Sequence, residues 1–149
     1  SCISLREIDL PDGILVLTEA LLCGCEKLER VGIPDSVRVI RESVFADCSN
    51  LKSVKLPANL EKLDAMAFAG CKSLREISIP DSCRHLCYGV FKGCTSLEKA
   101  IIGNGVSNEQ GGEDCFLAFQ SVLDVLVHKL FLFLMPSKGW MVLCRAVDT

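Results

Sequence analysis

Apolar residues recur along most of the chain at a fixed step of 23 residues. Each copy begins with a cysteine, followed by a leucine three residues later and an apolar pair, and in the first four copies a proline follows the pair. The cysteines of this column are Cys2, Cys25, Cys48, Cys71 and Cys94. Apolar and polar residues alternate around the apolar pair, as in a strand with one buried face, and the proline ends the strand because it has no backbone N–H. The alternation therefore predicts one short strand in each copy.

A repeat of this length predicts a solenoid, because a single copy cannot bury a core and must stack on its neighbours. Five copies, or rungs, are expected to place parallel strands roughly 4.8 Å apart. Phe45, Phe68 and Phe91 keep the same step and are expected to form one stacked column in the core. The period fails after Val106, which divides the chain into a repeat domain, residues 1–106, and a non-repeat tail, residues 107–149.

The repeated motif resembles the BspA-like class of leucine-rich repeats. The matching pattern is Cys-x-x-Leu-x-x-Ile-x-Leu-Pro, then an apolar-x-x-apolar pair, then Ala/Val-Phe-x-x-Cys, and it covers residues 2–106. The resemblance implies a leucine-rich repeat solenoid of the α/β horseshoe class, rich in β-structure. It also implies a non-catalytic role in protein–protein interaction or adhesion. Members occur in bacterial and protist surface proteins, which suggests a cell-surface or secreted location, and in larger intracellular proteins, which leaves the cytoplasm open.

Two columns of residues lie between the inward apolar positions of the strands, so they should face outward. One column reads Glu, Arg, Ser, Glu, Lys and the other reads Asp, Gly, Lys, Ser, Ile, so both change chemistry from rung to rung. Solenoids of this kind commonly bind on this face, and the alternative is a solvated face with no partner. The residues predicted to bind are Glu7, Asp9, Arg30, Ser53, Lys55, Glu76, Ser78 and Lys99.

Charge narrows the class of partner. The formal net charge is −3, without the basic patch or stripe that nucleic-acid binding requires. We therefore expect a protein partner and no nucleic acid. Because the chain begins at Ser1, beside a repeat, we also expect a fragment or a processed product.

The chain has ten cysteines, which raises the question of disulfides or zinc. Equivalent Cβ atoms on stacked rungs stay about as far apart as the strands, beyond the roughly 3.5–4.5 Å of a disulfide. No Cys-x-x-Cys pair with a second half-site occurs, so no metal and no cofactor is expected. The repeated cysteines should be buried thiols, whereas Cys87, outside the column, should face solvent.

The tail contains a long apolar segment, residues 116–135. Gln120, Asp124 and His128 recur every four residues, which predicts a helix somewhere within residues 114–135. Three interpretations remain open. The segment caps the last rung, spans a membrane, or is a non-native ending, and charges near its middle disfavour the span.

An enzyme is the alternative from another functional class. Cys115 or Cys144 would supply a nucleophile, with His128 as base and Asp124 to orient it. Nothing in the spacing brings these residues together. The leading hypothesis is therefore an interaction module without catalytic residues.

Overall fold

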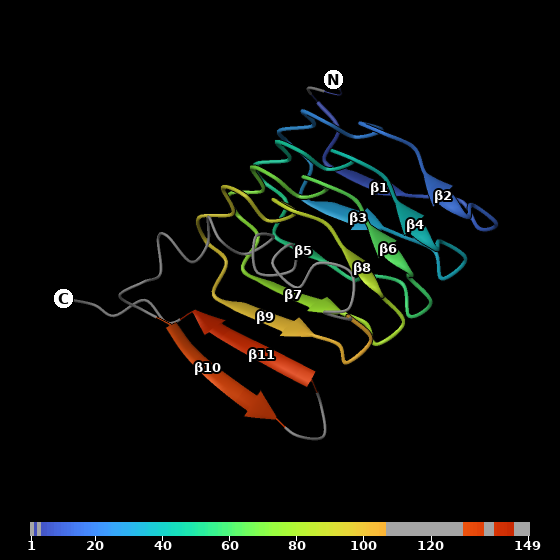
Figure 1. Ribbon diagram of the computed structural model, residues 1–149. Helices are drawn as coiled ribbons and strands as arrows, with labels where there is room; N and C mark the ends of the chain where they lie inside the picture. Colours follow the sequence, from blue (N-terminus) through green and yellow to red (C-terminus); the bar gives the residue numbers. More distant parts are fainter. Residues whose placement is uncertain (1, 3, 107–129, 136–138, 145–149) are drawn as a thin grey trace.

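The computed structural model describes residues 2, 4–106, 130–135 and 139–144. The repeats wind into a solenoid with one strand on each of two sides (Figure 1). The first sheet face consists of β1 (Glu7–Asp9), β3 (Arg30–Gly32), β5 (Ser53–Val54), β7 (Glu76–Ile79) and β9 (Lys99–Ile102). The second sheet consists of β2 (Val16–Leu17), β4 (Val39–Ile40), β6 (Lys62–Leu63) and β8 (His85–Leu86).

The strands pair in parallel, in the register set by the repeat. Glu7 lies opposite Arg30 and Glu76 opposite Lys99, each 23 residues further along the chain. The first sheet face contains two hydrogen-bonded groups, β1–β3–β5 and β7–β9, which meet side by side at β5 and β7. The parallel solenoid predicted from the period is confirmed.

The core is made of the repeated apolar columns. Phe45, Phe68 and Phe91 are fully buried. Their rings stack with centroids 5.0 Å and 5.9 Å apart and interplanar angles of 14° and 13°. Leucine columns on both sheets are equally buried, and no polar or charged side chain is buried in the described part of the chain. The predicted phenylalanine column is therefore confirmed.

The first rung departs from this pattern. Cys2 is exposed, whereas Cys25 and its later counterparts are buried, so the prediction of a fully buried cysteine column is wrong at its first member. Leu21 is 45% exposed, although Val44, at the equivalent position of the next rung, is completely buried. Both differences have the same cause: in the described part of the chain, no rung packs against the outer side of the first.

After the last rung, the tail forms a β-hairpin, β10 (Leu130–Met135) and β11 (Gly139–Cys144). Strand β11 pairs antiparallel with β9, which extends the first sheet face by two strands (Figure 1). A helix was predicted somewhere within residues 114–135. Residues 130–135 form a strand instead, and residues 114–129 lie outside the described residues, so the helix stays a prediction. No helix in the described part of the chain is long and apolar enough to cross a membrane.

Candidate interaction surface

The two outward columns lie on the first sheet face, where strand alternation places them. In β7 the pattern is regular, because Glu76 and Ser78 are exposed while Ile77 and Ile79 are buried. The other predicted binding residues are also exposed, except for Lys99, which is half-buried. The structure divides them into two groups with different surroundings.

The first group is a network of ion pairs on β1 and β3. Nη1 and Nη2 of Arg30 donate to the two carboxylate oxygens of Asp9, at 2.7 Å and 3.0 Å, and Nε donates to Glu7 at 3.3 Å. Gly32 makes the close approach of Asp9 possible, because a Cβ at residue 32 would overlap the Asp9 carboxylate. The side-chain hydrogen bonds that Arg30 donates lower the pKa of Asp9, and its hydrogen bonds to the carboxylates of Asp9 and Glu7 raise the pKa of Arg30. These three predicted binding residues are thus already paired with one another through hydrogen bonds between Arg30 and the two carboxylates.

The second group surrounds a hollow of about 530 Å³ over β5, β7 and β9. It contains five of the eight predicted binding residues, namely Ser53, Lys55, Glu76, Ser78 and Lys99. Its lining also includes Ala58, Pro80 and Ile101, which the sequence did not point to as binding residues. Ile101 belongs to an outward column but was not among the predicted binding residues.

Charges in the hollow are not neutralised by neighbours. In the part of the chain that the structure describes, Lys55, Glu76 and Lys99 form no ion pair. By contrast, Lys52 lies 2.6 Å from a carboxylate oxygen of Glu29. The hollow therefore presents two cations and one anion to solvent or to a partner.

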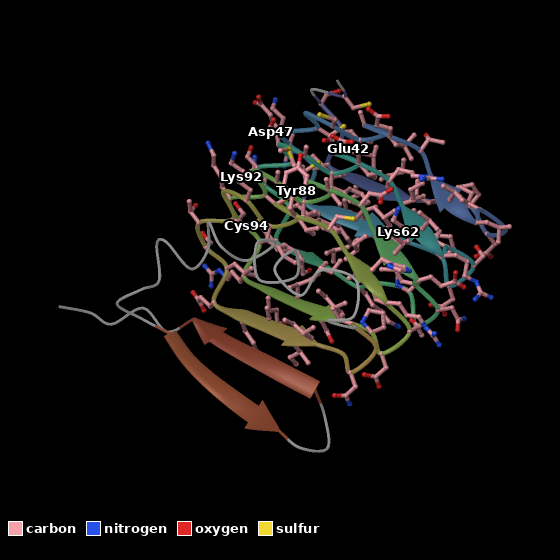
Figure 2. All side chains as sticks on the ribbon, in the orientation of Figure 1. Glu42, Asp47, Lys62, Tyr88, Lys92 and Cys94 are labelled. Carbon is pink, nitrogen blue, oxygen red and sulfur yellow. The ribbon has the colours of Figure 1, made fainter. Side chains whose placement is uncertain are left out.

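A charged cluster on the second sheet surrounds Asp64, whose side chain is only 14% exposed. Its carboxylate lies 2.7 Å from Nζ of Lys62, which is labelled in Figure 2, and 3.6 Å from Nη1 of Arg41. Cys87 Sγ lies 3.7 Å from the same carboxylate. Cys87 is half-buried rather than fully solvent-facing, which corrects the prediction for this thiol. The ion pair between Arg41 and Asp64 connects two neighbouring rungs.

The buried cysteines form a ladder of hydrogen bonds. Cys48, Cys71 and Cys94 each donate from Sγ to a backbone carbonyl of the preceding rung, at 3.1–3.2 Å. Burial raises the pKa of all three thiols, that of Cys48 and Cys94 to about 12. Neutral, enclosed thiols of this kind are poor nucleophiles and metal ligands.

Other candidate chemistry is sparse in the described residues. No disulfide joins the cysteines of residues 2–106, and no group of three His, Cys, Asp or Glu side chains in the described residues is placed to hold a metal ion. Of the residues of the enzyme alternative, Cys115, Asp124 and His128 lie outside the described residues. Cys144 ends strand β11.

Solved structures with similar folds are all leucine-rich repeat proteins. One, from T. pallidum, is 31% identical with a TM-score of 0.64, over 65% of this chain and 45% of that one. Another, from Bacteroides ovatus, is 35% identical with a TM-score of 0.64, over 68% and 26% of the two chains. A leucine-rich cell surface protein from Faecalibacterium prausnitzii is 29% identical with a TM-score of 0.63, over 74% and 29%.

The matched part of this chain thus spans less than half the length of each of these proteins. Comparison with curated proteins gives no match. A family model described as the BspA type leucine-rich repeat region, with six copies, matches residues 1–122, somewhat beyond the end of the regular period. The chain belongs to the BspA-type leucine-rich repeat family.

Proposed function

We propose that this chain is a non-catalytic interaction module that binds a protein partner on its first sheet face, over β5, β7 and β9. The observation that carries the proposal is the hollow of about 530 Å³ on this face, which is lined by residues of the outward columns. Its charged residues form no ion pair within the described chain, so a partner would not have to break existing contacts to reach them.

Other surfaces of the described chain support binding less well. On β1 and β3, Arg30 is already engaged by Glu7 and Asp9. A partner would have to replace those contacts and would gain little from them, since exposed ion pairs contribute about 0–1 kcal/mol. On the second sheet, Asp64 is likewise paired with two cations. The proposed site is therefore the part of the first sheet face where the charges are unsatisfied.

Adhesion at a cell surface is a narrower form of this proposal. It is supported by the similarity to the cell surface protein of Faecalibacterium prausnitzii, of which the chain covers 29%. Repeats that present one extended face suit adhesion because the face can contact a partner at several rungs at once.

The proposal is tested by removing the charges of the hollow together. The triple variant Lys55→Ala, Glu76→Ala, Lys99→Ala should keep its fold, because surface changes usually alter stability by less than about 0.5 kcal/mol each. A matched control changes Lys72, Lys92 and Glu42 to alanine, which removes the same charges from exposed positions outside the hollow.

Proteins captured by the immobilised parent chain should be lost on the hollow variant and retained on the control. Circular dichroism and thermal melting should show the same fold for all three. A captured partner that binds the hollow variant with unchanged affinity would show that binding occurs elsewhere.

A further inference from the structure

Three rungs contribute six outward positions to the hollow, arranged in two columns of three. Neighbouring members of a column are 23 residues apart. The first column carries a hydroxyl, an acid and a base, and the second carries a base, a hydroxyl and an apolar side chain. In order along the solenoid, the columns are Ser53, Glu76 and Lys99, and Lys55, Ser78 and Ile101.

The two lysines of the hollow, Lys55 and Lys99, differ in whether an acidic residue of the hollow shares their column. Glu76 and Lys99 are direct neighbours on β7 and β9, so Lys99 has an acidic residue beside it, although the two form no ion pair. Lys55 belongs to the second column, in which no other residue of the hollow is charged. Lys55 is therefore the cation most able to attract a negative group from a partner.

The turn beside Lys55 strengthens this difference. Ala58 lines the hollow at a position where the preceding rungs carry Asp12 and Asp35 and the following rung carries Asp81. Asp81 is engaged elsewhere, because its Oδ1 accepts a hydrogen bond of 2.8 Å from the backbone N–H of Asn104. Among these four rungs, the rung of Lys55 is therefore the one whose turn has no carboxylate at this position.

The other end of the same column is apolar. Ile101 is the only residue with a large apolar side chain in either outward column, and it is half-buried. It lies two rungs from Lys55, which corresponds to roughly 9.6 Å at the usual strand spacing. In a polyproline II helix, which has three residues per turn and a rise of about 3.1 Å per residue, side chains three residues apart face the same way and lie about 9.3 Å apart. A segment in this conformation, running across the strands, therefore matches this distance.

On this basis we infer that the hollow recognises an acidic segment in the polyproline II conformation, in which Asp or Glu is followed three residues later by a large apolar residue. The carboxylate pairs with Lys55 and the apolar side chain packs against Ile101. This inference rests on the proposed function, because it specifies the partner of the same surface.

The test uses fluorescently labelled eight-residue peptides that carry Asp-x-x-Leu in a neutral background. Matched peptides carry Lys in place of Asp, or Asp-x-Leu, and binding to the purified chain is measured by anisotropy at low salt. The Asp-x-x-Leu peptide should bind most tightly. Lys55→Gln should weaken it about two- to fivefold, as expected for losing one exposed ion pair.

Charge reversal provides the sharper comparison. Lys55→Glu should lose more affinity for the Asp peptide than Lys55→Gln and should prefer the Lys peptide, whereas the control Lys72→Glu should behave like the parent. Ile101→Ser should weaken the Asp and Lys peptides alike, since it removes only the apolar contact. Melting curves of each variant establish that the fold is intact.

Equal binding of the three peptides, or an unchanged preference in Lys55→Glu, would overturn the inference. Selection from a random peptide library then separates the two proposals. Peptides that depend on the hollow but lack the acid-x-x-apolar pattern would leave the proposed function standing and refute this inference. Selected peptides that bind the triple hollow variant as well as the parent would refute both.

Discussion

Replacing Phe68 with alanine should be among the most destabilising single changes in the repeats. Phe68 is fully buried and stacks on two rings, Phe45 at 5.0 Å and Phe91 at 5.9 Å between centroids. A buried Phe→Ala change costs about 3–5 kcal/mol, and each stacked pair contributes about 0.5–1.5 kcal/mol beyond its buried area. Phe68→Ala should therefore lie near the top of that range. Phe45→Ala, with one stacked ring among the described residues, should cost about 1 kcal/mol less.

Urea unfolding followed by circular dichroism measures both variants against the parent. Tyr88→Ala is the matched control, because Tyr88 is 51% exposed and its loss should cost much less. A middle-rung defect should also broaden the transition, since each rung of a solenoid is stabilised only by its neighbours. A Phe68→Ala variant within about 1 kcal/mol of Tyr88→Ala would refute the stacked core, because such a cost is usual for surface changes.

Four further outcomes follow from the structure. Cys71 should react with a thiol reagent only after unfolding, which mass spectrometry of labelled protein will show, because burial encloses it and raises its pKa. Burial raises the pKa of Cys48 from 9.0 to about 12, so the protonated thiol stabilises the fold fully below pH 9. This contribution to the free energy of unfolding falls by about 1.4 kcal/mol per pH unit as the pH rises from 9 towards the raised pKa. Urea unfolding of the Cys48→Ala variant should therefore be less sensitive to alkaline pH than that of the parent. In an NMR titration, Arg30→Met should return the pKa of Asp9 from its lowered value towards 3.8. In the parent chain, the Arg30–Asp9 pair should stabilise the fold above pH 3.8 and lose this effect as the pH falls through the lowered pKa of Asp9. Deleting residues 110–149 removes β11 from the edge of β9, so sedimentation should show association through that open edge.

The period was sufficient to predict the parallel strands of the first sheet face, their register and the buried columns. The reason is physical: equivalent residues on stacked rungs meet the same surroundings, so one packing requirement repeats every 23 residues. Cys25 and Phe45 are therefore buried as predicted. Cys2 is the exception, because a column predicts burial only where a further rung covers it. The second sheet was not predicted, because one strand was expected in each copy and the structure has two.

The tail and the detail of the surface did not follow from the period. The four-residue polar spacing that suggested a helix lies in residues 120–128, outside the described residues. Residues 130–135 pair as a strand in a hairpin whose other strand joins the edge of β9, an interaction that no local pattern specifies. The outward columns correctly indicated exposed positions. They did not show that Arg30 would be engaged by Asp9 while Lys55 would remain unpaired, because that depends on side-chain directions across neighbouring strands.

The solenoid spacing also limits which partners can follow the first sheet face. Outward positions repeat along a column at roughly 4.8 Å, whereas residues of a polyproline II segment repeat at about 3.1 Å and every third side chain returns to the same face. The two spacings coincide only about every two rungs and three peptide residues, so a peptide lying along a column meets it at every third side chain. With three rungs in the hollow, such a segment gains two anchoring contacts, which is why Lys55 and Ile101 are the positions at which specificity should be decided. Changing these two residues should alter which partner binds without altering the fold, because neither carries part of the buried core.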